Sequence, residues 1–540
     1  MKDTPPAAPK TGHYRWRILA LLFVATTINY TDRSVLGVLA PTLQYKVFHW
    51  SDQDYAWINI AFKSAYAIGL VFVGAGIDRI GTRLGYSLSV AVWCAFSMMH
   101  ALVRPAFSVL GFSAARFGLG LGESGNFPAG IKAIAEWFPQ RDRALATGIF
   151  NSGTTIGAIV APIVIPMIVL PDGTHWQFSF LITGAFSMAW LVFWNRMYSP
   201  PASHPLVSAE ELALIQGGVR PEEPGARIPW HRLLGVRETW GFAIAKVTDA
   251  AWWFYLFWGG KYLYDQFGLD IKALALPLIT IYGISGFGSI AGGWVSSALI
   301  GRGWPVNRAR KTALLGSALF ILPVVFVTAV PTRFNADQGF YERLAAARYK
   351  AEVEVRSAGS VTIERTLLPV PADALAALRS LSGRSFGSAR EFTAAASAAL
   401  ARPMPGNMES VLAGCARSDS LYWIAVLLMA TAAAGHQAWS ANLFTVVSDV
   451  FPKSTTAFLT GFGGMFGAVA GLMADWSLGR VLTSSGPVGY LFAFLAAGSV
   501  YLFCFGMLQA LIPHMTPLDN DLRHKVPGRS GEPGPGGARA

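Results

Sequence analysis

The segment EWFPQRDRALATG at residues 136–148 returns later in the chain as DVFPKSTTAFLTG at residues 449–461. Aligned without gaps, the two copies share Phe-Pro, Ala and Thr-Gly at the same positions, and each copy opens with an acidic residue. Chance explains two or three matches, but not this set at equivalent places in the chain. The sequence therefore predicts two structurally related halves.

Apolar windows surround both copies of the repeat. A helix that crosses a bilayer needs about 20 mostly apolar residues. Six windows of that kind precede a polar stretch at 197–240, and six follow it. They cover 17–38, 56–76, 86–103, 109–131, 144–166, 178–196, 241–264, 272–299, 311–330, 420–440, 455–476 and 488–512. The predicted fold is all-α and integral to the membrane, with twelve transmembrane helices in two pseudo-symmetric six-helix halves, 17–196 and 241–512.

The composition excludes several classes of protein. Of 540 residues, 53% are hydrophobic and 14% are charged, whereas roughly a quarter of a soluble domain is charged. The net charge of +12 comes from Lys and Arg in short loops rather than from one basic face, so nucleic acid is not an expected partner. Cys94, Cys415 and Cys504 are scattered and give neither a disulfide framework nor a zinc motif. We expect no metal, no cofactor and no enzyme activity.

The positive charges also predict an orientation. Loops after even-numbered windows are rich in Lys and Arg, and such loops face the cytoplasm. We therefore expect cytoplasmic positions for the tails 1–16 and 513–540 and for the central loop 197–240. The apolar run from Ile18 is interpreted as a first membrane helix, not a signal peptide, because it continues without a convincing cleavage site.

A polar, Ala-rich insert at 331–419 interrupts the second half and is expected on the outer side. Its stretch YERLAAARYKAEVEV at 341–355 is compatible with an amphipathic helix, so a small extramembrane subdomain is possible. Long loops are usually functional or disordered. A tolerated insertion is the favoured interpretation, and a recognition module is the alternative.

Charged side chains lie inside the first and fourth windows. Each costs about 2.5–3.5 kcal/mol on insertion scales and is a functional candidate by default. The first window contains NYTDR at 29–33, and the fourth contains Arg116 and Glu123 two helical turns apart. The guanidinium fork of Arg33 suits a carboxylate better than any lysine does. Glu123 is the first candidate proton carrier and Asp32 the second, while an interhelical clamp between Arg116 and Glu123 is the alternative.

The tenth window places His436, Trp439 and Asn442 in one polar and aromatic stripe. Such a stripe suits a sugar, because an aromatic ring packs on its apolar face and amides bind its hydroxyl groups. A histidine that only makes a packing hydrogen bond is the alternative for His436.

Three lysines lie within or near the ends of other windows. Lys63 in the second window is a further candidate anion ligand. Lys246 precedes Asp249 by about one helical turn, and a structural ion pair explains both. Lys261, near the outer end of the seventh window, either attracts anions or extends to the membrane surface.

The loop GAGIDRIGTRLG at 74–85 joins the second and third windows. Its glycines permit tight turning and close helix approach, and its charged residues can form a network that breaks when the halves move. No GKS or GKT follows, so it is not a phosphate loop. We predict a gating loop that consists of Gly74, Asp78, Arg79, Gly81 and Arg83.

These motifs resemble those of a known family. The GxxxDRxGxR loop at 74–83, the twelve windows and the repeated halves resemble the major facilitator superfamily throughout, except in the insert. NYTDR, RFGLGLGESGNFPAG at 116–130, EWFP at 136–139 and GIFNSGTTIGAIVAP at 148–162 resemble its anion:cation symporter family more narrowly. GHQAWSANLFTVVSDVFPK at 435–453 is similar to the bacterial hexuronate transporters.

The resemblance implies roles for matching residues. Tyr30 and Arg33 would bind a sugar-acid carboxylate, Asp32 and Glu123 would carry protons, and Arg116 would couple to Glu123. Trp439 and Asn442 would line the second half of the site. Thr154 stands where galactonate-transporting relatives have glutamine, which disfavours galactonate. WGGKYL at 258–263 departs from the family pattern, which has a proline before the lysine.

The expected function is proton-coupled symport that imports hexuronates such as glucuronate and galacturonate by alternating access. The expected location is the bacterial cytoplasmic (inner) membrane, where the protein is a monomer in the lipid bilayer and the proton is the coupling ion. Alternatives are transport of another organic anion, such as an aldonate, tartrate or an aromatic carboxylate, a uniporter or exchanger mechanism, and a transporter-like sensor.

Overall fold

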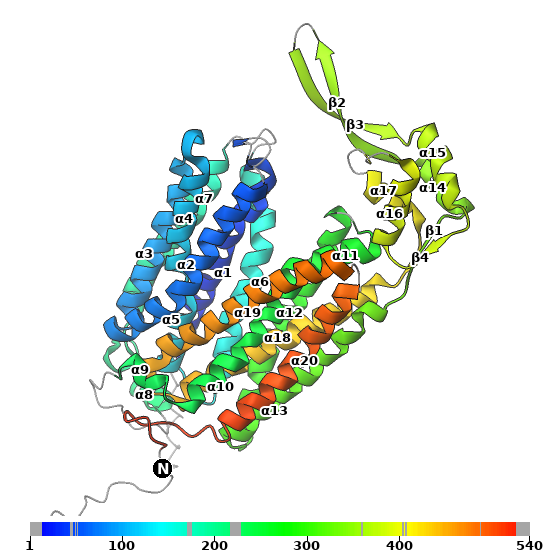
Figure 1. Cartoon of the computed structure of the whole chain (residues 1–540). Helices are drawn as coiled ribbons and strands as arrows, with labels where there is room; N and C mark the ends of the chain where they lie inside the picture. The colour runs from blue at the N-terminus through cyan, green and yellow to red at the C-terminus, as the bar shows by residue number, and fades with distance from the viewer. Residues whose placement is uncertain are drawn as a thin grey trace, which may run out of the picture.

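The computed structural model describes residues 13–43, 47–48, 50, 52–169, 175–216, 228–269, 271–357, 360–401, 404, 408–485 and 488–524 (Figure 1). Most of both predicted tails lies outside these residues. Eight helical stretches among them are long and apolar enough to cross a membrane. The other predicted spans correspond to α1, α4 with α5, α10 with α11, and α18, whose bounds follow.

The N-terminal half begins with α1 (Tyr14–Thr42) and ends with α7. Between them lie α2 (Asp52–Ile80), α3 (Thr82–Met99), η2 (His100–Leu102), η3 (Pro105–Phe107), α4 (Ser108–Glu123), α5 (Asn126–Trp137) and α6 (Arg143–Ile168), and α7 covers Trp176–Met197. A break at Ser124 and Gly125 divides the predicted fourth span into α4 and α5.

A connection with η4 (Pro201–Ser203), α8 (Ala209–Gln216) and α9 (Trp230–Leu233) follows the first half. The buried Glu211 of α8 accepts hydrogen bonds from the backbone N–H groups of Tyr14 (3.1 Å) and Arg15 (3.0 Å). These N–H groups have no partner within α1, because they lie at its first turn. The connection therefore caps the first helix and holds the start of α1 against the bundle.

The C-terminal half consists of α10 (Arg237–Ala245), η5 (Lys246–Thr248), α11 (Asp249–Phe267), α12 (Ile271–Gly301), α13 (Val306–Ile321), η6 (Leu322–Ala329), α18 (Tyr422–Val450), η8 (Lys453–Thr455), α19 (Thr456–Ser485) and α20 (Val488–Leu511). Helix α18 continues ten residues beyond the predicted end of the tenth apolar window at residue 440. The last turns of α18 carry the polar residues Asn442, Thr445 and Asp449, so a hydropathy window ends before them. Neighbouring helices nevertheless bury these side chains.

The halves cross at the glycines that close each copy of the repeat. A Cβ atom at Gly148 of α6 would collide with the backbone of Ser289 in α12. A Cβ atom at Gly461 of α19 would collide in the same way with the backbone of Leu70 in α2. Equivalent glycines thus meet equivalent helices of the opposite half, so the repeat marks the two crossings of a pseudo-symmetric molecule.

The insert folds around its own core. It contains β1 (Thr332–Asn335), α14 (Gln338–Ala346), β2 (Arg348–Ser357), β3 (Ser360–Pro369), α15 (Ala372–Leu378), η7 (Arg379–Leu381), β4 (Ser385–Phe386), α16 (Ala389–Leu400), α17 (Met408–Ala416) and β5 (Arg417–Ser420). An antiparallel sheet has the order β4–β1–β5, and β2 pairs with β3 from Arg348↔Pro369 to Ser357↔Ser360. Phe334, Phe340 and Phe392 pack together in the core.

The prediction of one helix at 341–355 is wrong beyond Ala346. From Arg348 the chain forms strand β2, because the alternating residues of KAEVEV suit a strand and β3 provides its hydrogen-bonding partner. Gln266 at the end of α11 joins the insert to the bundle by donating to Thr332 Oγ1 (3.0 Å) and to the Gly387 carbonyl oxygen (3.1 Å).

We call the end of the bundle where α1 begins and α20 ends the tail end, and the opposite end, which carries residues 332–420, the insert end. Figure 1 shows the two halves close together at the tail end and farther apart at the insert end.

Candidate functional site

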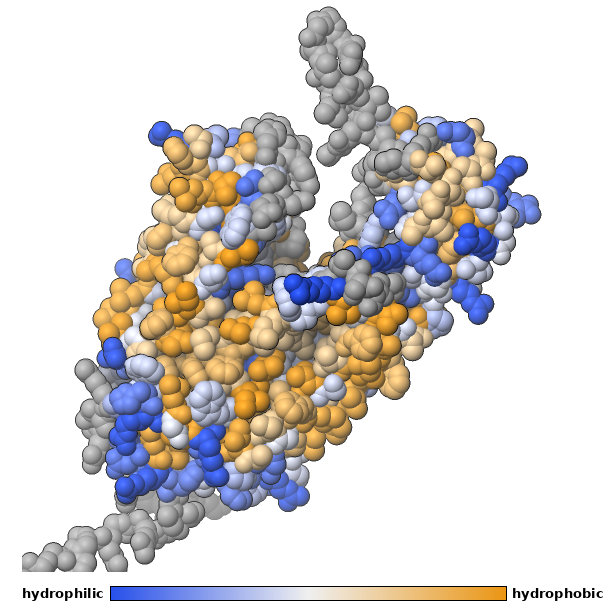
Figure 2. All heavy atoms as spheres, in the orientation of Figure 1, coloured by the Kyte–Doolittle hydropathy of each residue, from blue (hydrophilic) through white to orange (hydrophobic). Residues whose placement is uncertain are grey.

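A cavity of about 750 Å³ lies between the two halves. The space-filling view shows the molecule hollowed between the halves toward the insert end (Figure 2). Four cationic side chains, one carboxylate and a set of aromatic rings contribute to its wall. Its lining includes Tyr30, Arg33, Tyr55, Phe62, Lys63, Tyr66, Arg116, Asn151, Thr154, Lys246, Asp249, Trp252, Trp253, Tyr282, His436, Gln437, Ser440 and Phe444.

Arg33 of α1 is the central cation of the N-terminal wall. Its Nε donates to Glu123 Oε2 at 2.9 Å. Its guanidinium carbon lies 4.6 Å from the ring centres of both Tyr30 and Tyr66. Its buried Nη2 has no hydrogen-bond partner in the described part of the chain. The side chain as a whole is 17% exposed and lines the cavity, and a guanidinium group in such a wall is suited to a carboxylate.

Glu123 lies behind Arg33 and does not line the cavity, because its side chain is fully buried. The expected coupling of Arg116 to Glu123 is wrong as a direct ion pair in this conformation. Arg116 instead donates to the backbone carbonyl of Arg33 at 3.4 and 3.5 Å, while Arg33 itself pairs with Glu123. Arg33 therefore stands between the cavity and the buried carboxylate.

Asp32 does not face the cavity. Its carboxylate accepts hydrogen bonds from Ser97 Oγ (3.2 Å) and Ser187 Oγ (3.0 Å), on α3 and α7. Successive residues of a helix point about 100° apart, so Asp32 and Arg33 face different neighbours. The structure thus brings Arg33 and Glu123 together and leaves Asp32 within the N-terminal bundle.

The predicted stripe on the tenth span reaches the cavity only at His436. Trp439 is fully buried and packs on Tyr501 with ring centres 5.5 Å apart, and Asn442 donates to the Gly292 carbonyl oxygen at 2.9 Å. Neither lines the cavity, so that prediction is wrong. Three residues advance about 300° around a helix, and six advance about 600°, so these positions rotate progressively away from His436.

Sequence reasoning missed several lining residues. Trp252 stacks on His436 with ring centres 5.3 Å apart, and Asn151 Nδ2 donates to Gln437 Oε1 across the two halves at 2.5 Å. An amide within each of two apolar windows was the available signal. Lys63 does line the cavity, whereas Lys261 pairs with Asp265 at 2.7 Å away from it.

The predicted gating loop closes the tail end through Asp78. Lys132 Nζ lies 2.6 Å from Asp78 Oδ1, and the carboxylate accepts hydrogen bonds from the backbone N–H groups of Ala457 (3.3 Å) and Phe458 (2.7 Å). Those groups belong to the first turn of α19, where a helix has unpaired N–H groups. A Cβ atom at Gly74 would lie 2.6 Å from the Ala457 carbonyl oxygen, so only glycine permits this approach.

The other members of the loop lie within the N-terminal half. Gly81 has φ +89° and precedes α3, a conformation that favours glycine. Arg83 donates to the backbone carbonyl of Asn195, and Arg79 is exposed. The structure therefore assigns the contact between halves to Gly74 and Asp78, and does not extend it to Arg79, Gly81 or Arg83.

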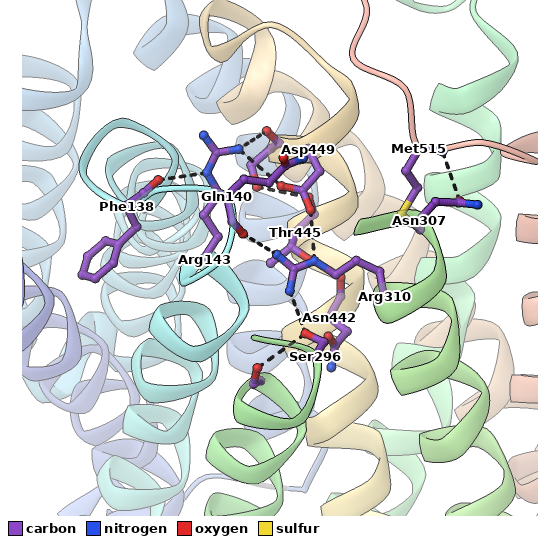
Figure 3. Close-up of polar contacts among 12 residues, drawn as sticks. Phe138, Gln140, Arg143, Ser296, Asn307, Arg310, Asn442, Thr445, Asp449 and Met515 are labelled. Carbon is purple, nitrogen blue, oxygen red and sulfur yellow. Dashed lines mark hydrogen bonds and ion pairs between the residues drawn. The ribbon is translucent and has the colours of Figure 1, made fainter. Parts of the chain in front are cut away.

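A second contact at the tail end is centred on Asp449, the acidic residue that opens the second repeat copy (Figure 3). Its carboxylate pairs with Arg143 of α6 (3.3 Å) and with Arg310 of α13 (3.0 Å). Arg310 also donates to the Gln140 carbonyl oxygen at 2.7 Å, and Arg143 donates to the Ser448 carbonyl oxygen at 2.5 Å. We call Arg143, Arg310 and Asp449 the Asp449 cluster. It joins the two halves below the cavity.

A two-half helical membrane protein with a cation-lined central cavity, closed at one end by contacts between the halves, is a membrane transporter by architecture. The Major Facilitator Superfamily model matches residues 22–337, and the chain belongs to this superfamily. Its members are transporters and not enzymes. The predictions of this family, of the twelve-helix fold and of the absence of enzyme activity are confirmed.

Relatives and solved structures agree with this assignment. The chain is 32% identical to a galacturonate transporter of Dickeya chrysanthemi over 317 residues, which are 57% of this chain and 90% of that protein. It is 31% identical to a hexuronate transporter of Escherichia coli (strain K12), over 57% of this chain and 72% of that protein. The fold is similar to that of FucP, a Major Facilitator Superfamily transporter in the outward conformation. The TM-score is 0.59 at 12% sequence identity, and the match covers 92% of this chain and 99% of FucP.

Proposed function

We propose that the protein is a proton-coupled symporter that imports hexuronates such as glucuronate and galacturonate across the bacterial cytoplasmic membrane. The observation that carries this proposal is the partly exposed Arg33 side chain in the cavity wall, paired with the fully buried Glu123 directly behind it. The names of the galacturonate and hexuronate transporters support the substrate class. With cytoplasmic tails, the closed tail end is cytoplasmic and the cavity faces outward.

Glu123 and the substrate carboxylate compete for the guanidinium group of Arg33, and this competition couples substrate binding to proton binding. In the structure Arg33 neutralises Glu123. When a substrate carboxylate takes the guanidinium fork, Glu123 is left as a buried carboxylate that has lost its partner. Protonation removes that cost, because a neutral carboxyl tolerates burial better than a carboxylate does. Substrate and proton therefore favour each other's binding, and the loaded cavity carries compensated charge as it closes.

The test is uptake of labelled glucuronate into proteoliposomes that contain the purified protein, with an inward proton gradient. Symport predicts accumulation that collapses when an uncoupler removes the gradient. Equilibration without accumulation would contradict coupling and identify a uniporter. Absence of flux with folded protein would contradict the substrate, and other organic anions would then be tested.

A matched variant tests the role of Glu123. Glu123→Gln keeps the size and burial of the side chain but cannot release a proton. We expect counterflow exchange of glucuronate to continue in this variant and gradient-driven accumulation to disappear. Accumulation by Glu123→Gln at the wild-type level would assign the proton to another residue, of which Asp32 is the next candidate.

A further inference from the structure

A second ion pair lies in the C-terminal wall of the cavity. Lys246 Nζ is 2.6 Å from Asp249 Oδ2, and both residues line the cavity. The seventh span is interrupted at this place, because α10 ends at Ala245, the 3₁₀ turn η5 follows, and α11 begins at Asp249. A 3₁₀ stretch within a long helix often marks a functional position.

Two glycines of α19 make room for this pair. A Cβ atom at Gly467 would lie 2.7 Å from Asp249 Oδ2 and 3.0 Å from the Lys246 carbonyl oxygen. A Cβ atom at Gly463 would lie 3.0 Å from Lys246 Cγ. The ammonium group of Lys246 also lies 4.3 Å from the ring centre of Phe444. The ion pair of Lys246 and Asp249 is therefore closely packed against α19 and Phe444.

The two ion pairs of the cavity present opposite charges to it. In the N-terminal half the cation is the more exposed partner, with Arg33 at 17% and Glu123 at 0%. In the C-terminal half the carboxylate is the more exposed partner, with Asp249 at 19% and Lys246 at 4%. Among the described residues, none donates a hydrogen bond to Asp249 Oδ1. A carboxylate oxygen with spare capacity accepts hydrogen bonds from hydroxyl groups.

We propose that Asp249 sets both the orientation and the class of the substrate, which is a sugar acid with a single carboxylate. The substrate carboxylate binds at Arg33, and its hydroxyl groups donate to Asp249. Trp252, about one turn after Asp249 and also in the cavity wall, packs against the C–H face of the sugar. A sugar diacid of the same length brings its second carboxylate against Asp249, and this like-charge contact disfavours its binding. The proposal rests on the proposed function.

The test is isothermal titration of the protein in lipid nanodiscs with D-glucuronate and D-glucarate. The two share a six-carbon skeleton, but glucuronate closes to a hemiacetal ring, whereas glucarate has a second carboxylate at C1 and stays open, so the Asp249 variant below separates the effect of charge from that of shape. We expect the wild type to bind glucuronate at least about tenfold more tightly than glucarate, because like-charge contacts are costly at binding sites. Affinities within threefold of each other would overturn the proposal without recourse to any variant.

Asp249→Asn tests the residue itself. This variant removes the repelling charge and leaves Lys246 without its anion, so we expect the ratio of glucarate Kd to glucuronate Kd to fall by about tenfold. Asp265→Asn is the matched control, since Asp265 lies on the same helix, pairs with Lys261 at 2.7 Å and does not line the cavity. An unchanged ratio in Asp249→Asn would overturn the proposal. Failure of the wild type to bind either compound would overturn the proposed function and this inference with it.

Discussion

Arg33 uses one nitrogen for Glu123 and its guanidinium group contacts two tyrosine rings, while Nη2 lacks a partner in the described structure. Stacking of this kind restricts the guanidinium without occupying its hydrogen-bond donors. Arg33 is therefore held in place before an anion arrives, which reduces the entropy lost on binding.

Replacement of Arg33 tests whether its guanidinium group binds the substrate carboxylate. We expect Arg33→Ala to weaken glucuronate binding by about a hundredfold or more, since loss of one member of a buried charge pair costs about 2–5 kcal/mol. Arg33→Lys should recover only part of the affinity, because an ammonium group cannot form the two-pronged contact. Titration of both variants in nanodiscs measures the effect. Equal affinity of Arg33→Lys and the wild type would argue against a bidentate carboxylate contact.

The sequence singled out both Arg33 and Glu123 as candidate site residues, but it did not indicate which arginine pairs with Glu123. Spacing along α4 relates Arg116 to Glu123, whereas the observed partner comes from α1. Contacts between helices depend on their packing and rotation, which periodicity within a single helix does not contain.

At the scale of elements, two glycines permit the crossings of α6 with α12 and of α19 with α2. Each lies against a backbone of the other half, where no side chain fits. Small residues at such positions let membrane helices approach closely and gain van der Waals contact. The repeat seen in the sequence is thus explained by the geometry of two equivalent crossings.

We expect Gly461→Ala to lower the thermal stability of the protein, because the added Cβ collides with the Leu70 carbonyl and separates α19 from α2. Gly506→Ala on α20 is the matched control, since a Cβ there meets nothing within 4 Å. That control should be neutral or stabilising by up to about 1 kcal/mol, from the helix preference of alanine. Thermal unfolding in detergent compares the two, and equal melting temperatures would refute a tight crossing at Gly461.

The whole molecule is closed at the tail end by charged contacts between the halves. Asp449 lies between two buried arginines, so its removal leaves two uncompensated cations. Breaking a buried pair in this way costs about 3–5 kcal/mol. The insert-end-open state depends on these contacts and loses population without them.

Cysteine labelling measures that population. Gly37 lines the cavity, and a Cβ there meets nothing within 4 Å, so Gly37→Cys provides a reporter of access from the insert end. In a Cys415→Ser background, we expect Asp449→Asn to slow labelling by a membrane-impermeant maleimide by several-fold. Arg83→Gln is the control, because Arg83 binds the Asn195 carbonyl within one half. Labelling at the wild-type rate in Asp449→Asn would show that the Asp449 cluster does not hold the tail end closed.

The two ends of the insert lie close together, so the insert can be removed from the bundle. Thr332 and Ser420, at its two ends, are paired across β1 and β5, so a short linker can join the bundle directly. Its core contains only its own residues. We expect a chain with residues 332–420 replaced by a Gly-Ser linker to keep glucuronate uptake within about twofold, as terminal junctions that lie close together tolerate such changes. Loss of uptake by a folded deletion variant would instead assign the insert a part in transport.

The sequence by itself determined the membrane-spanning helices, the two related halves and the charged residues of the first and fourth spans. These follow from hydropathy, an internal repeat and the high cost of charge in lipid, all of which are local properties. Only the tertiary structure decided that Arg33 holds Glu123, that Trp439 and Asn442 turn away from the cavity, and that Asp249 faces it. Those outcomes depend on how helices from distant parts of the chain rotate and pack against one another, which no single segment specifies.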